Sequence, residues 1–227
     1  MTQTWHDLLF AHWRVDNGSL RALVPAVFEL DTFEGDAWVG VVPFFMTNVA
    51  PRGLPALPWL SAFPELNVRT YVRHRGRGGV YFFSLDATNP VAVRVARTLF
   101  HLPYFTAAMS VQEHSGGRVT YESRRRDPRG ADAQLTATYG PVGEPTPPLP
   151  GTLEHFLTER YCLFTVDRRG RPCSVDIHHP PWPLQNAEAA ITVNTMAAAA
   201  GIVLPPDPPL LHFSKRQDMV AWRIRTE

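Results

Sequence analysis

The chain has 227 residues, of which 44% are hydrophobic and 19% are charged. A chain of this length can bury roughly 70–75% of its unfolded surface, so a large core is expected without metals or disulfides. There are 22 basic and 21 acidic residues, and the net charge of +1 gives no overall attraction to nucleic acid or to an anionic membrane. These values predict one globular domain over residues 1–227 and disfavour a strongly basic binding protein.

Neither a membrane span nor a secretory signal is expected. The longest apolar stretch, Ala37 to Met46, contains Pro43 and is far shorter than the roughly 18 residues that cross a bilayer. The first ten residues, MTQTWHDLLF, lack the basic and apolar regions of a signal peptide, which predicts a cytoplasmic protein. Cys162 and Cys173 do not have zinc-ribbon spacing, and we expect no cofactor and no metal.

Three segments have the pattern of a β-hairpin, with a turn between runs of Val, Phe, Tyr and Trp. They lie at residues 28–46, 67–85 and 105–126. The third alternates most clearly, with Val119, Tyr121 and Ser123 on one side of the strand. This pattern predicts a sheet of antiparallel strands.

Helical signals are fewer. Asn89 caps a helix that begins at Pro90 and continues at helical spacing to Leu102. Shorter helices are expected at Ser19 to Val24, Thr152 to Tyr161 and Thr195 to Ala200. The fold class predicted is therefore strand-rich α+β, with a strongly bent antiparallel sheet and a few short helices.

Polar residues interrupt the second hairpin. Asn67, Arg69 and Tyr71 alternate and so share one face of their strand. If that face looks into a barrel or cone, Arg69 is a buried cation that needs a carboxylate, supplied by Asp86 or Glu65 or by a ligand. Both readings stay open. Candidate ligand-binding residues on the partner strand and elsewhere are Ser84, Phe82, Tyr104 and Trp182, the last three as apolar walls.

Candidates for acid–base catalysis are Asp86, Glu159 and His178. Adjacent residues of a strand point to opposite faces, so only one of His178 and His179 can serve a site. Glu159 has an alternative role as a structural ion pair.

Two further features have alternatives. The arginine-rich stretches at residues 73–77, 124–129 and 167–171 are either solvated turns or a patch that binds a polyanion. Trp59 and Phe63, in the Pro-rich segment after Pro51, either cover the pocket or form a contact between copies of the chain. Nucleic acid and membrane are not expected partners, and a homo-oligomer is possible.

Long segments of the chain resemble the YqjF-like family of bacterial proteins. They are WHDLLFAHW, LRALVP, FELDTFEGDAWVGVVPFFM, RGLPALPWLSAFPELNVRTYV, VYFFSLDA, LPYF, FLTERYCLF, HHPPW and LLHFSKRQDMVAW. That family is similar in fold to acetoacetate decarboxylase, so the resemblance implies a β-cone around a small-molecule cavity.

The activity of acetoacetate decarboxylase does not follow from this resemblance. That enzyme works through a lysine that forms a Schiff base. Lys215 is the only lysine of the chain and lies near its end, beside Arg216, outside any paired-lysine strand motif. The sequence therefore predicts a protein that binds a small organic acid without a Schiff-base lysine. The alternative is an enzyme of the lyase or isomerase type that performs acid–base chemistry on a small keto acid.

Overall fold

The computed structural model describes residues 1–51 and 61–227. In this part of the chain, thirteen strands form one sheet. The strands are β1 (Thr2–Val15), β2 (Glu29–Leu30), β3 (Ala37–Ala50), β4 (Phe63–His74), β5 (Arg77–Ala87), β6 (Tyr104–Glu113), β7 (Val119–Arg125), β8 (Gln134–Thr146), β9 (Cys162–Val166), β10 (Pro172–His178), β11 (Leu184–Asn194), β12 (Leu210–Ala221) and β13 (Arg225–Thr226).

Three short α-helices begin at side-chain caps. Asp16 accepts a hydrogen bond from the backbone N–H of Ser19 at the start of α1 (Asn17–Leu23). Asn89 and Thr152 do the same for α2 (Pro90–Phe100) and α3 (Leu153–Thr158). These helices were predicted, whereas the helix expected at residues 195–200 is a single 3-10 turn, Ala198–Ala200. None of the helices in the described residues is long and apolar enough to cross a membrane.

Two of the three predicted hairpins are confirmed, namely β4 with β5 and β6 with β7. Of the first, only the turn forms, with an antiparallel bridge between Phe33 and Asp36. Its strands do not pair with each other, because β2 pairs with β4, and β3 lies between β1 and β4. The sheet is antiparallel except that β5 runs parallel to both β6 and β9. The strand-rich α+β prediction holds.

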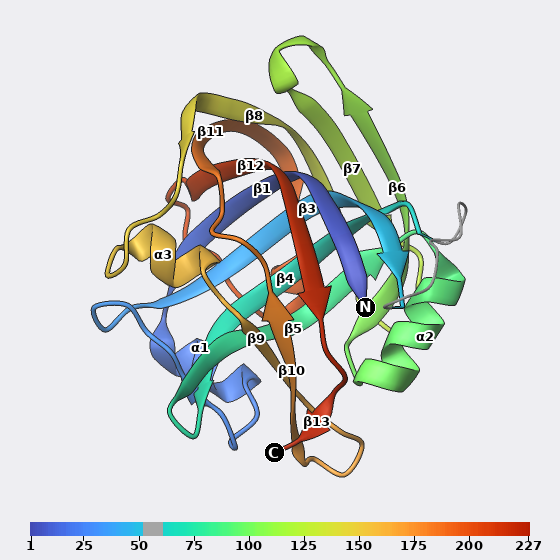
Figure 1. Cartoon of the computed structure of the whole chain (residues 1–227), viewed down its shortest axis with the longest axis vertical. Helices are drawn as coiled ribbons and strands as arrows, with labels where there is room; N and C mark the ends of the chain where they lie inside the picture. Colours follow the sequence, from blue (N-terminus) through green and yellow to red (C-terminus); the bar gives the residue numbers. More distant parts are fainter. Residues whose placement is uncertain (52–60) are drawn as a thin grey trace.

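The strand pairings close into two circuits that share one wall. The shared wall, which we call the central sheet, consists of β12, β1, β3, β4 and β5, and several of its strands cross the middle of Figure 1 side by side. The large circuit continues from β5 through β6, β7, β8 and β11 back to β12. The small circuit continues from β5 through β9 and β10 back to β12. A sheet closed in this way gives the bent, cone-like shape that was expected.

Each face of the central sheet lines one circuit. The large-circuit face, with Leu9, Val41 and Leu66, packs against Tyr121 and Tyr139 in the largest apolar cluster. On the small-circuit face, Leu8, Phe10, Val42 and Phe44 pack with Trp182, and Tyr71 packs with Leu157 of α3.

A β-bulge in β5 decides which side chains share a face. Val68 lies opposite Ser84 but Arg69 lies opposite Phe82, so Phe83 is the extra residue. Because residues directly opposite each other share a face, the bulge puts Phe82 on the face of Arg69 and leaves Ser84 on the face of Val68.

Candidate functional site

A histidine and an arginine meet across a glycine on the small-circuit face. His12 of β1 lies opposite Gly40 of β3, and Gly40 lies opposite Arg69 of β4. A Cβ atom at Gly40 would lie 2.9 Å from Nε2 of His12 and 3.5 Å from Cγ of Arg69. Glycine is therefore the residue that lets the imidazole and the arginine stem approach each other over the strand between them.

Tyr71 joins the two side chains. Its hydroxyl donates a hydrogen bond to the carbonyl oxygen of Leu157 over 2.7 Å. It also lies 2.7 Å from Nε2 of His12 and 3.4 Å from a terminal nitrogen of Arg69. Since its one proton goes to Leu157, the hydroxyl accepts from both neighbours. This network assigns the proton of His12 to Nε2 and leaves Nδ1 as an acceptor.

His12 is neutral and has one free acceptor. Its side chain is fully buried, and burial, with the nearby charges of Arg69 and His212, puts its pKa well below the ordinary value. Nδ1 has no hydrogen-bond partner among the described residues. The residue lines a cavity of about 870 Å³ together with Trp38 and the 205–210 segment.

Arg69 is half-buried and has no carboxylate partner in the described part of the chain. It donates to the carbonyl oxygen of Leu157 over 3.1 Å, and its guanidinium lies 5.4 Å from the ring centroid of Phe10. Its Nε is buried without a partner. Neither Asp86 nor Glu65 pairs with it, because both carboxylates are engaged elsewhere.

Further polar atoms on the same face lack partners among the described residues. His212 lies opposite Phe10, which is two residues before His12 in β1. Asn67 lies opposite Val42 and is two residues before Arg69 in β4. The unpartnered atoms are Oδ1 of Asn67, Nδ1 of His212 and Oγ of Ser214. Buried polar atoms in proteins nearly always have partners, so a group of them on one face indicates a place for water or a ligand.

Ser84 and Asp86 do not belong to this face. The bulge at Phe83 places them opposite Val68 and Leu66, on the large-circuit side. There the carboxylate of Asp86 accepts two hydrogen bonds from Arg125, at 2.7 and 2.8 Å, with both side chains almost fully buried. Ser84 was expected to bind ligand with Arg69, and Asp86 was one expected carboxylate partner of Arg69. Neither side chain lies on the face of Arg69, because simple alternation does not count the extra residue.

Tyr104 and Glu65 form a separate pair on the small-circuit face. Tyr104 donates a hydrogen bond of 2.8 Å to the carboxyl of Glu65, and burial raises the pKa of Glu65 to about 8. Glu65 is four residues from Arg69 along β4, which is roughly 13 Å for a strand. This carboxyl therefore titrates near neutral pH without touching Arg69.

The remaining predicted residues have structural contacts. Glu159 accepts from the backbone N–H of Trp182 over 2.8 Å and from the hydroxyl of Tyr161. Trp182 packs edge-on against Phe10, with ring centroids 4.9 Å apart, and donates to the carbonyl oxygen of Thr158. It is therefore a wall of the small-circuit face.

The two adjacent histidines differ in burial, and both rings lie near the ring of Tyr161. His178 is exposed, whereas His179 is buried and stacks on Tyr161. Phe82 lies opposite Arg69 on the neighbouring strand. Phe63 is buried beside α2, and Trp59 lies outside the described residues.

The side chain of Lys215 points to the opposite face of β12 from the side chain of Ser214. Its amine is 2.6 Å from a carboxylate oxygen of Asp7, and its side chain is 56% exposed. The described residues contain no group of three or more potential metal-ligating side chains.

The sequence analysis missed His12, His212 and Gly40. His12 and His212 are polar residues inside otherwise apolar strands, as Arg69 is. Their position beside Arg69 depends on which strands are neighbours, and that was not predictable from local pattern.

The two circuits and their shared wall define a protein of the acetoacetate decarboxylase-like fold. An acetoacetate decarboxylase from Legionella pneumophila is similar to it with a TM-score of 0.66 and 12% identity, covering 100% of this chain and 88% of that one. The enduracididine biosynthesis enzyme MppR in complex with pyruvate is similar with a TM-score of 0.65 and 12% identity, covering 99% and 89%.

Comparison of the amino-acid sequence with known families identifies the family of the chain. Residues 2–218 match the model of the DUF2071 family, described as "Uncharacterized conserved protein". The "Uncharacterized protein YqjF" of Bacillus subtilis is 51% identical over 225 residues, which cover 99% of this chain and 91% of that protein. The chain belongs to this family.

Proposed function

We propose that the protein binds a small organic acid on the small-circuit face, with Arg69 holding the carboxylate of the acid. The observation that carries this proposal is the charge of Arg69, which no carboxylate of the described residues neutralises. A half-buried guanidinium with an unpartnered Nε costs free energy unless an anion accepts its hydrogen bonds. A ligand carboxylate would do this in the paired geometry that arginine favours.

The surroundings support a small and partly apolar acid. Phe10 provides aromatic surface beside the guanidinium, and Trp182 packs edge-on against Phe10. Asn67 has an unpartnered amide oxygen on the same face. A cavity at the end of the central sheet where β1 ends and β12 begins has His12 in its lining. One protein of this fold has been seen in complex with pyruvate, which makes pyruvate a sensible first probe.

A second candidate is an enzyme that moves a proton on a bound keto acid. The neutral imidazole of His12, with Nδ1 unpartnered and Arg69 across Gly40, favours it. Nδ1 would take a proton from the carbon next to the carbonyl group, and the enolate would regain a proton from the same nitrogen. His12 is better placed for this than Asp86, Glu159 or His178.

Schiff-base chemistry forms no part of the proposal. The amine of Lys215 is exposed and paired with Asp7. An imine requires a neutral amine facing the bound acid.

A thermal-shift experiment tests the binding proposal. Pyruvate and acetoacetate would be compared with acetone at fixed pH and salt. A ligand at about a hundred times its dissociation constant adds about 2.7 kcal/mol of stability, and each kcal/mol raises the melting temperature by about 2–4 °C in a chain of this length. We expect the shift for the acids alone, and its loss in Arg69→Met.

Two further variants make the result decisive. Arg124→Met removes an exposed arginine of β7 and should leave the shift intact. Arg69→Lys keeps the charge and covers the case in which Arg69→Met fails to fold. An equal shift in the wild type and in both Arg69 variants would overturn the proposal.

The proton-transfer candidate has its own measurement. The methyl protons of pyruvate would be followed by NMR in deuterium oxide, where a base that enolises bound pyruvate exchanges them for deuterium. His12→Asn should abolish exchange while acid binding persists. Exchange at the rate seen without protein would exclude this activity and leave the binding proposal standing.

A further inference from the structure

A second cavity, of about 720 Å³, lies outside the small circuit and is rich in arginine. It sits where β5 passes from one parallel neighbour to the other, since β5 pairs with β9 at Val80 and Tyr81 and with β6 from Leu85 to Ala87. The cavity opens over the residues between these pairings and is closed on one side by α2. Four arginines line it: Arg94, Arg97, Arg129 and Arg168.

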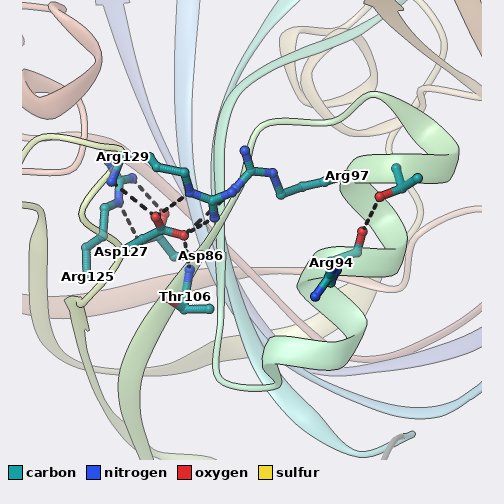
Figure 2. Close-up of polar contacts among 8 residues, drawn as sticks. Asp86, Arg94, Arg97, Thr106, Arg125, Asp127 and Arg129 are labelled. Carbon is teal, nitrogen blue, oxygen red and sulfur yellow. Dashed lines mark hydrogen bonds and ion pairs between the residues drawn. The ribbon is translucent and has the colours of Figure 1, made fainter.

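A buried aspartate positions two of these arginines. Asp127 accepts hydrogen bonds from the backbone N–H of Thr106, at 3.2 Å, and from Nε of Arg129, at 2.6 Å. Figure 2 shows Arg97 extending from α2 toward Asp127 and Arg129. The closest approach of Arg97 to that carboxylate is 4.0 Å, and its NH1 atom is buried without a hydrogen-bond partner.

The charge of this cavity is not balanced by the described residues. Asp127 is one negative charge shared by Arg97 and Arg129. The side chains of Arg94 and Arg168 have no ion pair there, and Asp167, the one acidic residue of the lining, is engaged by Arg171. Several guanidinium groups therefore face one space with an excess of positive charge.

Two of the arginine-rich stretches meet here. Residues 124–129 contribute Arg129, and residues 167–171 contribute Arg168. In the third stretch, Arg73 pairs with Asp31, and Arg77 pairs with Asp176 and Glu227. Positive charge is thus concentrated at one recess and largely neutralised at the turn of residues 73–77.

We propose that this cavity binds the phosphate group of a small phosphorylated organic molecule. A phosphate monoester carries nearly two negative charges at neutral pH and accepts several hydrogen bonds, which suits a set of arginines better than a single carboxylate does. The lining also contains apolar and aromatic residues that offer a surface for the organic part of the ligand, namely Tyr81, Phe83, Val93, Leu102 and Pro103.

Calorimetric titration of the intact protein with phenyl phosphate tests this proposal, with phenol as the neutral comparison. We expect phenyl phosphate to bind and phenol not to bind. Binding should weaken at least tenfold in Arg97→Met and in Arg168→Met, because each variant removes one of the cations that line the cavity. Arg168 lies exposed in a turn, so its variant tests the site even if Arg97→Met does not fold.

The matched control is Arg126→Met. Arg126 is an exposed arginine of residues 124–129 that does not line the cavity, and its loss should leave the affinity for phenyl phosphate unchanged. Equal weakening in Arg126→Met and Arg168→Met would overturn the proposal in favour of diffuse surface charge. Binding of a double-stranded DNA fragment with steep salt dependence, without binding of phenyl phosphate, would also overturn it and indicate a polyanion surface.

Discussion

The hydroxyl of Tyr71 lies 2.7 Å from Nε2 of His12, although 59 positions separate the two residues in the chain. This hydrogen bond fixes which nitrogen of the imidazole carries the proton, because the hydroxyl gives its own proton to Leu157. The unpartnered Nδ1 of His12 therefore belongs to an imidazole whose orientation is fixed by a hydrogen-bond network that ends at Leu157 of α3.

Tyr71→Phe should destabilise the protein by about 1–3 kcal/mol, since it leaves the buried Nε2 of His12 without a partner and removes one of the two hydrogen bonds that the carbonyl oxygen of Leu157 accepts. It should also weaken acid binding, because His12 and Arg69 lose the atom that holds them together. Thermal unfolding and the thermal-shift assay measure the two effects. The control is Tyr139→Phe, which removes a buried hydroxyl bonded to the carbonyl oxygen of Asp7 in the large circuit. It should cost stability but not acid binding, and equal binding losses in both variants would contradict the expectation.

Gly40→Ala should disturb the same network by steric overlap alone. The added carbon would lie 2.9 Å from Nε2 of His12, and such overpacking costs about 1–3 kcal/mol. Gly18→Ala is the control, because its nearest contact is a side-chain oxygen of Asp16 at 3.3 Å. A double-mutant cycle of Gly40→Ala with His12→Ala measures the coupling free energy between these two positions. The cost of Gly40→Ala should shrink in the His12→Ala background, and an unchanged cost would show that the imidazole is not what the glycine accommodates.

Asp86 and Arg125 should behave as a structural pair. Asp86→Asn removes the charge that compensates a guanidinium with 3% of its side chain exposed, and breaking a buried pair in this way costs about 3–5 kcal/mol. The double variant Asp86→Leu with Arg125→Met should cost less than Asp86→Asn, because no buried charge remains. Chemical denaturation measures both. Glu188→Gln, in the exposed pair with Arg118, should cost less than about 1 kcal/mol.

Glu65 should make the protein less stable as the pH rises. Its pKa in the folded protein is about 8, whereas an unperturbed glutamate has a pKa of 4.5. Between these values the folded state holds a proton that the unfolded state has released, so the free energy of unfolding falls with pH by at most about 1.4 kcal/mol per unit. Below about pH 4.5 this contribution is constant, and above about pH 8 the full penalty is present.

The measurement is urea denaturation at a series of pH values from 5 to 8. Glu65→Gln should flatten the dependence, since the amide can accept the hydrogen bond of Tyr104 without titrating. Glu29→Gln, an exposed residue of β2, should leave the slope as it is in the wild type. An identical slope in Glu65→Gln would mean that another group causes the dependence.

Local sequence pattern determined a large part of the structure. Asp16, Asn89 and Thr152 mark the helix starts, because a side-chain oxygen there satisfies a free N–H group. Alternation placed Asn67, Arg69 and Tyr71 on one face of β4, since the side-chain period of a strand is two. It also singled out Arg69 as a cation in an apolar strand.

The tertiary structure decided which groups meet. An extra residue in β5, Phe83, moves Ser84 and Asp86 to the other face, and such a shift has no sequence signal because a bulge depends on the partner strand. The meeting of His12 with Arg69 requires β1, β3 and β4 to be neighbours, and that order is set by the packing of whole strands. Alternation acts within a strand and is visible in the sequence, whereas the neighbours of a strand depend on the burial of the complete sheet.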